Sequence, residues 1–208
     1  MLSKAKVVAR DVAALVFVSL AMLCAPVLAQ QADQPGVKDG DQWSFVVFPS
    51  AAPNRVWVVK SVMATGIHAT ENGEPLTLTL DLNVVDSPLL TQTNPLMLRF
   101  PMRVGDRWTF ATDVRFKDNG STARAVFEVA VIAHEKVRVA AGEFDAFKLV
   151  AKSRFTGSSK GGPGKLEGES MHTYWYAPTA RAIVKSLSQS PYRGKSTVEL
   201  AAFELRPL

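Results

Sequence analysis

Four side chains close together in the sequence, His172, Tyr174, Trp175 and Tyr176, are the ones best suited to contact a ligand. An imidazole donates, accepts or titrates near neutral pH, and aromatic rings bury large apolar areas. The same stretch alternates as a β-strand does, so a histidine that merely occupies a strand position fits the pattern as well. We treat these residues as a candidate ligand-binding site and assign them no catalytic role.

Patterns typical of catalysis are missing from the sequence. His134-Glu135 begins like the zinc motif H-E-x-x-H, but Arg138 stands where the second histidine is required. There is no G-x-S-x-G, and the Gly-rich stretch 157–165 lacks the spacing of a phosphate-binding loop. That stretch is better explained as a hairpin connection. The sequence therefore predicts no catalytic residue, no metal site and no cofactor.

The first 29 residues have the layout of a cleavable secretory signal. A basic start precedes an apolar run from Val12 to Leu23, which is too short to span a bilayer comfortably. Small or apolar residues then lead to a cleavage site after Ala29. We predict a signal over 1–29, a flexible mature N-terminus over 30–35, and an exported protein that is periplasmic or secreted, with no transmembrane span after cleavage.

Two alternatives to this cleavage are a retained anchor and a lipoprotein signal. A lipoprotein signal would use Cys24, but Leu23 precedes it where a small residue is expected. Cys24 is the only cysteine, so the mature chain would have no disulfide, thiol nucleophile or cysteine metal site. Without the three basic and one acidic side chains of the signal, the net charge falls from +5 to +3. So small a charge gives no reason to expect a nucleic-acid partner.

The rest of the chain repeats with a period of two residues, as half-buried strands do. Asn72-Gly73 and Asn119-Gly120 provide turns of the type I′ hairpin kind between them. We predict an all-β antiparallel body of about ten strands, a strongly curved sheet that forms a partial barrel or a sandwich. The expected strands are 41–48, 55–63, 76–84, 96–100, 106–116, 123–131, 147–155, 170–177, 182–188 and 195–205.

A short motif occurs twice, as Gly40-Asp41-Gln42-Trp43 and as Gly105-Asp106-Arg107-Trp108. Glycine provides the backbone freedom for a turn, aspartate bonds to backbone amides, and tryptophan enters the following strand on its buried face. The repeat predicts one β domain, 36–208, built from two related halves, about 36–100 and 101–208.

A second turn motif lies between Val139 and Lys148, with Gly142 at the turn and Phe144 buried after it. Together with the G-D-x-W opening at 105–108, a T-Y-W-Y-A-P element at 173–178 and I-V-K at 183–185, it resembles a family of uncharacterised bacterial exported proteins. One departure is Ala140, where many relatives carry proline. The resemblance implies a periplasmic or envelope β-protein and no catalytic residue.

Two classes of function remain open. The first is a non-enzymatic envelope protein that holds an apolar, lipid-like ligand or a protein partner, since a concave apolar sheet face needs a cover. A further non-enzymatic alternative is a purely structural protein that adds a sheet edge to another chain. The second class is a hydrolase of an envelope polymer, with acidic residues that only the fold brings together.

Overall fold

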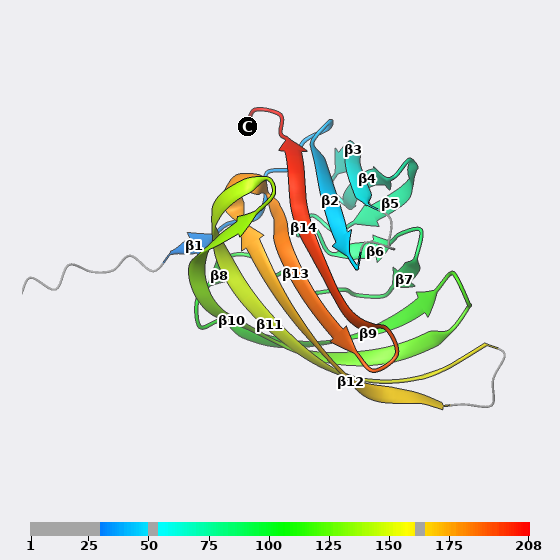
Figure 1. The fold of residues 1–208 in the computed structure, drawn as a ribbon. Coiled ribbons are helices and arrows are strands. Elements are labelled where there is room, and N and C mark those ends of the chain that lie inside the picture. The colour runs from blue at the N-terminus through cyan, green and yellow to red at the C-terminus, as the bar shows by residue number, and fades with distance from the viewer. Residues whose placement is uncertain (1–29, 50–53, 161–164) are drawn as a thin grey trace, which may run out of the picture.

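The computed structural model describes residues 30–49, 54–160 and 165–208, and these form a β-structure with one short 3-10 helix (Figure 1). The predicted signal over 1–29, with Cys24, lies outside the described residues. No helix within the described ranges is long and apolar enough to cross a membrane. In chain order the elements are β1 (Gln31–Ala32), β2 (Gln42–Phe48), β3 (Arg55–Met63), β4 (Gly66–Glu71), β5 (Glu74–Leu78), β6 (Val84–Asp86), β7 (Leu90–Gln92), β8 (Met102–Arg103), β9 (Arg107–Phe116), β10 (Thr122–Val139), β11 (Gly142–Ser158), β12 (Lys165–Ala177), η1 (Pro178–Ala180), β13 (Ala182–Ser190) and β14 (Gly194–Glu204).

Twelve of these strands close into an antiparallel barrel, while β1 and β8 pair apart from it. Within the barrel each strand pairs with the next along the chain, with β7 pairing to β9 past β8, and β14 pairs with β2 to complete the ring. The all-β antiparallel prediction is confirmed. The prediction of a partial barrel or a sandwich of about ten strands falls short in two respects, because the ring is closed and contains twelve strands. Closure also removes free sheet edges.

The differences in strand number come from the side of the barrel built by short strands. The sequence pattern missed β4, and β6 and β7 have only three residues each. The expected strand 76–84 is interrupted, because Leu82 adopts a positive φ of 63° and its N–H bonds to the carbonyl of Thr79. The Asn72-Gly73 turn is confirmed with positive φ at both residues, whereas at the second Asn-Gly turn only Gly120 has one.

The expected strand 96–100 is also wrong. This segment has no strand partner, because the side chain of Asn83 takes the place of one. Asn83 Oδ1 accepts the N–H of Leu98 at 2.7 Å, and Asn83 Nδ2 donates to the Leu98 carbonyl at 2.8 Å. Both residues are buried, so the segment belongs to the packed end of the barrel.

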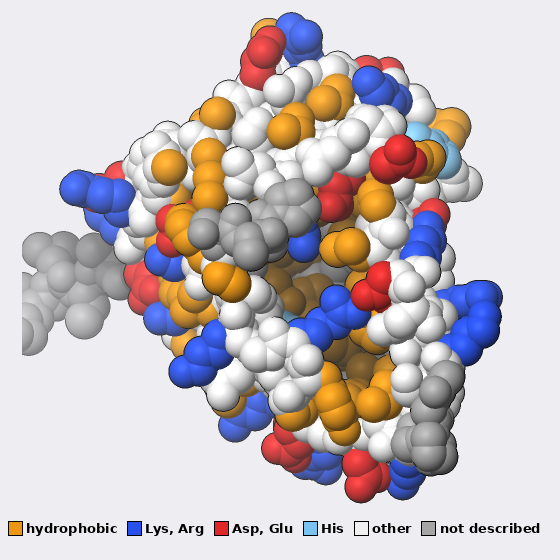
Figure 2. Space-filling model, turned by 45° about the vertical axis from the view of Figure 1, so that its right-hand side comes forward, with side chains coloured by type: hydrophobic (Ala, Val, Ile, Leu, Met, Phe, Trp, Pro, Cys, Tyr) orange, Lys and Arg blue, Asp and Glu red, His pale blue; other side chains and the backbone are white. Residues whose placement is uncertain are grey.

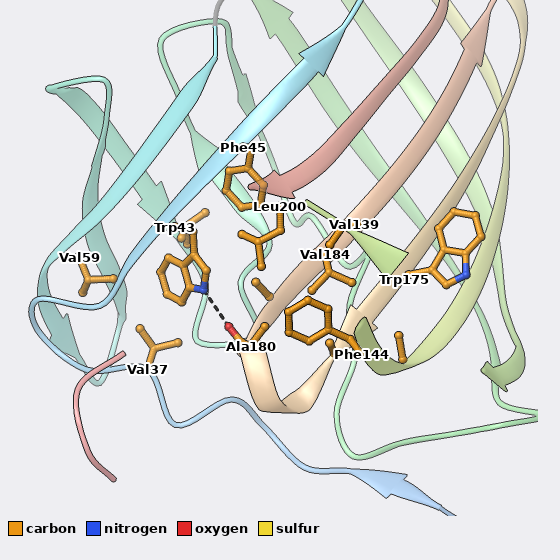
Figure 3. Packing of buried hydrophobic residues seen from close by; sticks show 14 of the residues in the cluster. Val37, Trp43, Phe45, Val59, Val139, Phe144, Trp175, Ala180, Val184 and Leu200 are labelled. Carbon is orange, nitrogen blue, oxygen red and sulfur yellow. Dashed lines mark hydrogen bonds between the residues drawn. The ribbon is translucent and has the colours of Figure 1, made fainter. Parts of the chain in front are cut away.

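The barrel is open at one end and packed at the other. Strands β10, β11 and β12 have 18, 17 and 13 residues and extend beyond the short strands β2 to β7 (Figure 1). At the opposite end, two clusters of buried hydrophobic residues fill the interior. Figure 3 shows the first, with Trp43 pointing toward the Ala180 carbonyl and Val37, Val59 and Leu200 around it.

Both copies of the Gly-Asp-x-Trp motif build the same turn. Gly40 and Gly105 have φ values of +87° and +99°. Each following aspartate accepts the N–H of the residue three positions earlier through its carboxylate, at 2.9 Å for Asp41 and 2.7 Å for Asp106. Each turn is then joined by two backbone hydrogen bonds to a neighbouring strand. In the structure each copy thus forms a turn that leads into a strand; the relation between two whole halves stays a prediction.

The tryptophans of the two copies also play the same part. Trp43 Nε1 donates to the carbonyl of Ala180 at 2.8 Å, and Trp108 Nε1 donates to that of Leu96 at 2.7 Å. Both rings are buried. Each indole hydrogen bond links the start of a strand to a segment at the packed end of the barrel.

The two aspartates differ in their surroundings. Asp41 has no exposed surface and forms an ion pair with Arg181, Oδ2 to Nη1 at 3.1 Å. Its Oδ1 accepts the N–H of Arg206 at 2.7 Å, and Arg181 Nη2 donates to the Arg206 carbonyl at 3.1 Å. A charge removed from water needs such partners. Asp41 therefore joins the start of β2, the turn before β13 and the tail after β14.

We predict that Asp41→Ala lowers the free energy of unfolding by about 3–5 kcal/mol, because it leaves a buried guanidinium unpaired. The matched control is Asp106→Ala, which removes the same turn hydrogen bond from a more exposed copy and should cost about 1 kcal/mol. Urea unfolding of both variants measures the difference. Equal losses would show that the buried pair contributes nothing beyond the turn.

Candidate functional site

A cavity of about 810 Å³ lies inside the barrel and reaches its open end. Its lining comes from inward-facing positions of strands β2, β3, β6, β7 and β9 to β14 and from the loops beside them. Figure 2 shows the molecule hollowed on this side, with hydrophobic side chains inside the hollow. A cavity of this size could hold a small molecule.

One wall of the cavity is apolar and is formed mainly by β9 and β10. Phe110 and Phe127 stand on neighbouring strands, and their rings stack with centroids 4.9 Å apart. They face inward because every second residue of a barrel strand does. Further apolar lining residues are Phe45, Trp57, Val84, Leu90, Met97, Val114, Phe116, Ala123, Ala125, Phe155, Leu166 and Val198.

Strands β11, β12 and β13 follow β10 around the ring, and beside Phe155 and Leu166 they provide a polar wall. The register places Ser153 between Phe127 and Ser170, so the aromatic wall passes directly into hydroxyl groups. His172 and Tyr174 follow on β12 at the next inward positions. Serines of β13 stand opposite them, Ser188 beside His172 and Ser186 beside Tyr174.

His172 is held in a fixed orientation. Its Nδ1 lies 2.9 Å from Ser188 Oγ, and its ring stacks on Tyr174 with centroids 6.0 Å apart and an angle of 9° between the planes. Burial lowers the pKa of His172, so the imidazole is neutral at neutral pH. Burial raises the pKa of Tyr174, so its phenol keeps its proton. Both residues thus offer neutral hydrogen-bonding atoms.

An arginine bridges the mouth of the cavity. Arg193, in the turn between β13 and β14, places its guanidinium 4.4 Å from the ring centroid of Phe116. Its Nη2 lies 3.6 Å from Asp118 Oδ2, in the turn between β9 and β10. Figure 2 shows a basic side chain lying across the hollow next to an acidic one. Both partners of this ion pair are half exposed, so the bridge can open at little cost.

The four candidate residues divide between two environments. His172 and Tyr174 line the cavity, but Trp175 and Tyr176 do not. Trp175 donates its indole N–H to Glu135 Oε1 at 2.8 Å and lies under the Lys148 ammonium, 5.1 Å from its ring. Tyr176 follows a bulge and is buried at the packed end. The structure therefore brings two of the four residues together and separates the other two from them.

Other predicted motif residues have structural positions. Gly142 begins β11 with a φ of +134°, and Phe144 is buried against Phe203, with ring centroids 5.9 Å apart. The residues that sequence reasoning missed are the cavity-lining serines and Arg193. The alternation of Ser186, Ser188 and Ser190 along one face of a strand was the available signal.

The cavity offers little for acid chemistry or metal binding. Among the described residues its lining includes one carboxylate, that of Asp118, which pairs with Arg193. Across 30–49, 54–160 and 165–208, no group of three His, Cys, Asp or Glu side chains could hold a metal ion.

No family model and no curated protein matches this chain. Among solved structures, a presumed lipoprotein from Parabacteroides distasonis matches with a TM-score of 0.53 and 12% identity, over 84% of this chain and 100% of its own. A presumed exported protein with a YmcC-like fold from Bacteroides fragilis has a TM-score of 0.48, 16% identity and 83% and 99% coverage. The hypothetical lipoprotein YmcC of Escherichia coli has 0.43, 15%, and 81% and 85%. The first likeness shows a shared fold.

We predict that His172 makes the protein less stable in mild acid. Its pKa is lowered from 6.5 in the folded chain, so the unfolded chain binds the proton more readily. Stability is then lost as pH falls below 6.5, until the folded pKa is reached. Urea unfolding between pH 7.5 and 5.5 should show a smaller loss for His172→Asn than for the wild type. Parallel curves would contradict the prediction.

Proposed function

We propose that this chain is an exported envelope protein that binds an apolar, lipid-like ligand inside its barrel and catalyses no reaction. The observation that carries the proposal is the cavity of about 810 Å³ with its mainly apolar lining. Small-molecule sites have volumes of about 300–1,000 Å³, so the cavity has the size of a binding site.

The lining explains why the ligand should be apolar. Aromatic and aliphatic side chains from β2, β9 and β10 face the cavity, and contact with water costs free energy in proportion to their area. A ligand that displaces this water recovers that free energy. The bridge from Arg193 to Asp118 lies at the mouth, where such a ligand would enter.

Export is supported by two independent observations. A signal over 1–29, as predicted from the sequence, would direct the chain out of the cytosol. The Parabacteroides distasonis protein that shares the fold is described as a lipoprotein, a class that resides in the envelope. A periplasmic or secreted location for this chain accords with both.

The cavity lining and the sheet topology do not favour the two alternative functions, a polymer hydrolase and a partner protein that adds a strand. A polymer hydrolase of the two-carboxylate kind needs a pair of acids across a cleft, and the described cavity lining provides Asp118 alone. A partner protein that adds a strand needs a free sheet edge, whereas the strands of the main sheet are paired all round the ring.

Native mass spectrometry of the protein purified from its own cells tests the proposal. We expect a bound amphiphile that stays with the folded protein and is released on denaturation. Binding of an apolar fluorescent compound, N-phenyl-1-naphthylamine, to the emptied protein provides the second measurement. A protein that carries no ligand and does not bind the naphthylamine would overturn the proposal.

We predict that Ala125→Trp weakens naphthylamine binding by roughly tenfold or more, equivalent to about 1.4 kcal/mol, because the indole occupies cavity volume. Ala125 lines the cavity on β10 and is 6% exposed. The control is Val126→Trp, one residue along the same strand, on the outer face and 44% exposed. Thermal unfolding checks that both variants fold. Equal affinities of the two variants would show that the compound binds outside the barrel.

A further inference from the structure

The polar wall of the cavity contains hydrogen-bonding groups that the protein leaves without partners. Ser153 is 4% exposed and lines the cavity, yet its hydroxyl makes no hydrogen bond to any described residue. The hydroxyl of Tyr174 likewise has no partner within the described chain. His172 uses Nδ1 for Ser188, so Nε2 is the nitrogen that remains.

These three groups lie on adjoining strands. Ser153 on β11 pairs in register with Ser170 on β12, and His172 and Tyr174 follow Ser170 at successive inward positions. The ring of His172 contacts Phe127 on the apolar side, with centroids 6.0 Å apart. The polar groups therefore meet the apolar wall inside the cavity, away from its mouth.

A plain hydrocarbon chain does not complement this wall. A buried donor or acceptor that loses water and gains no partner is destabilised. A hydrocarbon chain seated against Ser153, His172 and Tyr174 would displace their water without replacing its hydrogen bonds. A ligand with an oxygen atom at the same depth would replace them.

The neutral character of the polar wall limits which kind of oxygen atom in a ligand it can bind. Strands β11, β12 and β13 contribute no Lys, Arg, Asp or Glu to the described lining, and the imidazole is neutral there. The arginines of the lining have anionic partners elsewhere: Arg181 with Asp41, Arg55 with Glu71, and Arg193 with Asp118. A carboxylate or phosphate against the wall would be desolvated without a counter-charge. A hydroxyl or carbonyl oxygen carries no such cost.

We propose that Ser153, His172 and Tyr174 bind a neutral hydroxyl or carbonyl oxygen inside an otherwise apolar ligand, so that the barrel selects oxygenated lipids over plain acyl chains. This inference rests on the proposed function, namely that the cavity holds an apolar ligand. It adds a selectivity that an apolar pocket alone does not have, because a site with hydrogen-bonding groups rejects an analogue that leaves them unpaired.

Displacement of N-phenyl-1-naphthylamine by a matched series of ligands tests the inference. Stearic acid is compared with stearic acids that carry one hydroxyl at carbon 3, 10 or 12, which differ from it only in a neutral oxygen at known depth. 12-Oxostearic acid provides a carbonyl at carbon 12 in place of the hydroxyl. We expect the wild type to bind at least one oxygenated ligand roughly tenfold more tightly than stearic acid. A preference for a hydroxy acid identifies a hydroxyl, and a preference for the oxo acid alone identifies a carbonyl.

The variant Ser153→Ala/Tyr174→Phe removes two hydroxyls and keeps the apolar shape of the wall. It should lose the preference while binding stearic acid at least as tightly as the wild type. The control is Thr173→Val, which removes a hydroxyl between His172 and Tyr174 on a position outside the cavity lining, and should keep the preference.

Three other results of this experiment would each contradict a different claim. Equal binding of stearic acid and all oxygenated ligands by the wild type would overturn the selectivity and leave the proposed function intact. A preference that survives in Ser153→Ala/Tyr174→Phe would overturn the assignment to this wall. Failure of every ligand and of the naphthylamine to bind would overturn the proposed function itself.

Discussion

The closure of twelve strands into one ring is the constraint on which the rest of the structure depends. A barrel of about eight strands is just wide enough for its own side chains to fill, and width grows with strand number. Inward side chains of a twelve-stranded wall therefore leave space unless something else occupies it. At one end that space is filled by the 3-10 helix, the 93–101 segment and two hydrophobic clusters; at the other the cavity remains.

The packed end is held by interactions that span the chain. Asp41, Arg181 and Arg206 lie far apart in sequence and meet where the first and last barrel strands pair. Replacing Asp41 by an apolar residue would leave a buried cation, which is strongly destabilising even where the intact pair adds little net stability. Its counterpart Asp106 repeats the turn without the buried cation, which shows that the motif builds the turn and that the context gives Asp41 its second role.

The sequence predicted strands well wherever one face was buried over many residues. A clear period of two predicted β10 and β11, and residues that favour strands predicted β2, β3, β9 and β12 to β14. Three-residue strands such as β6 and β7 are too short for a period, and closure depends on the pairing of β14 with β2, which no local pattern contains. The 96–100 segment misled the prediction because Leu98 is buried as in a strand but bonds to a side chain, that of Asn83.

The same limit applies to the candidate site. Alternation along β12 predicts that Trp175 faces away from His172 and Tyr174. Only the closure of the ring determines which of the two faces of the strand lines the cavity. In the sequence, the serines of β11 and β13 look like solvent-facing positions. Closure of the ring places them inside the barrel, where under the proposed function their hydroxyls would contact the ligand. Under the proposed function the two walls have different roles. The stacked rings of Phe110 and Phe127 offer apolar contact to any lipid chain, while His172, fixed by Ser188, would distinguish chains by the oxygen they carry. A barrel lined with phenylalanine alone would bind without that distinction.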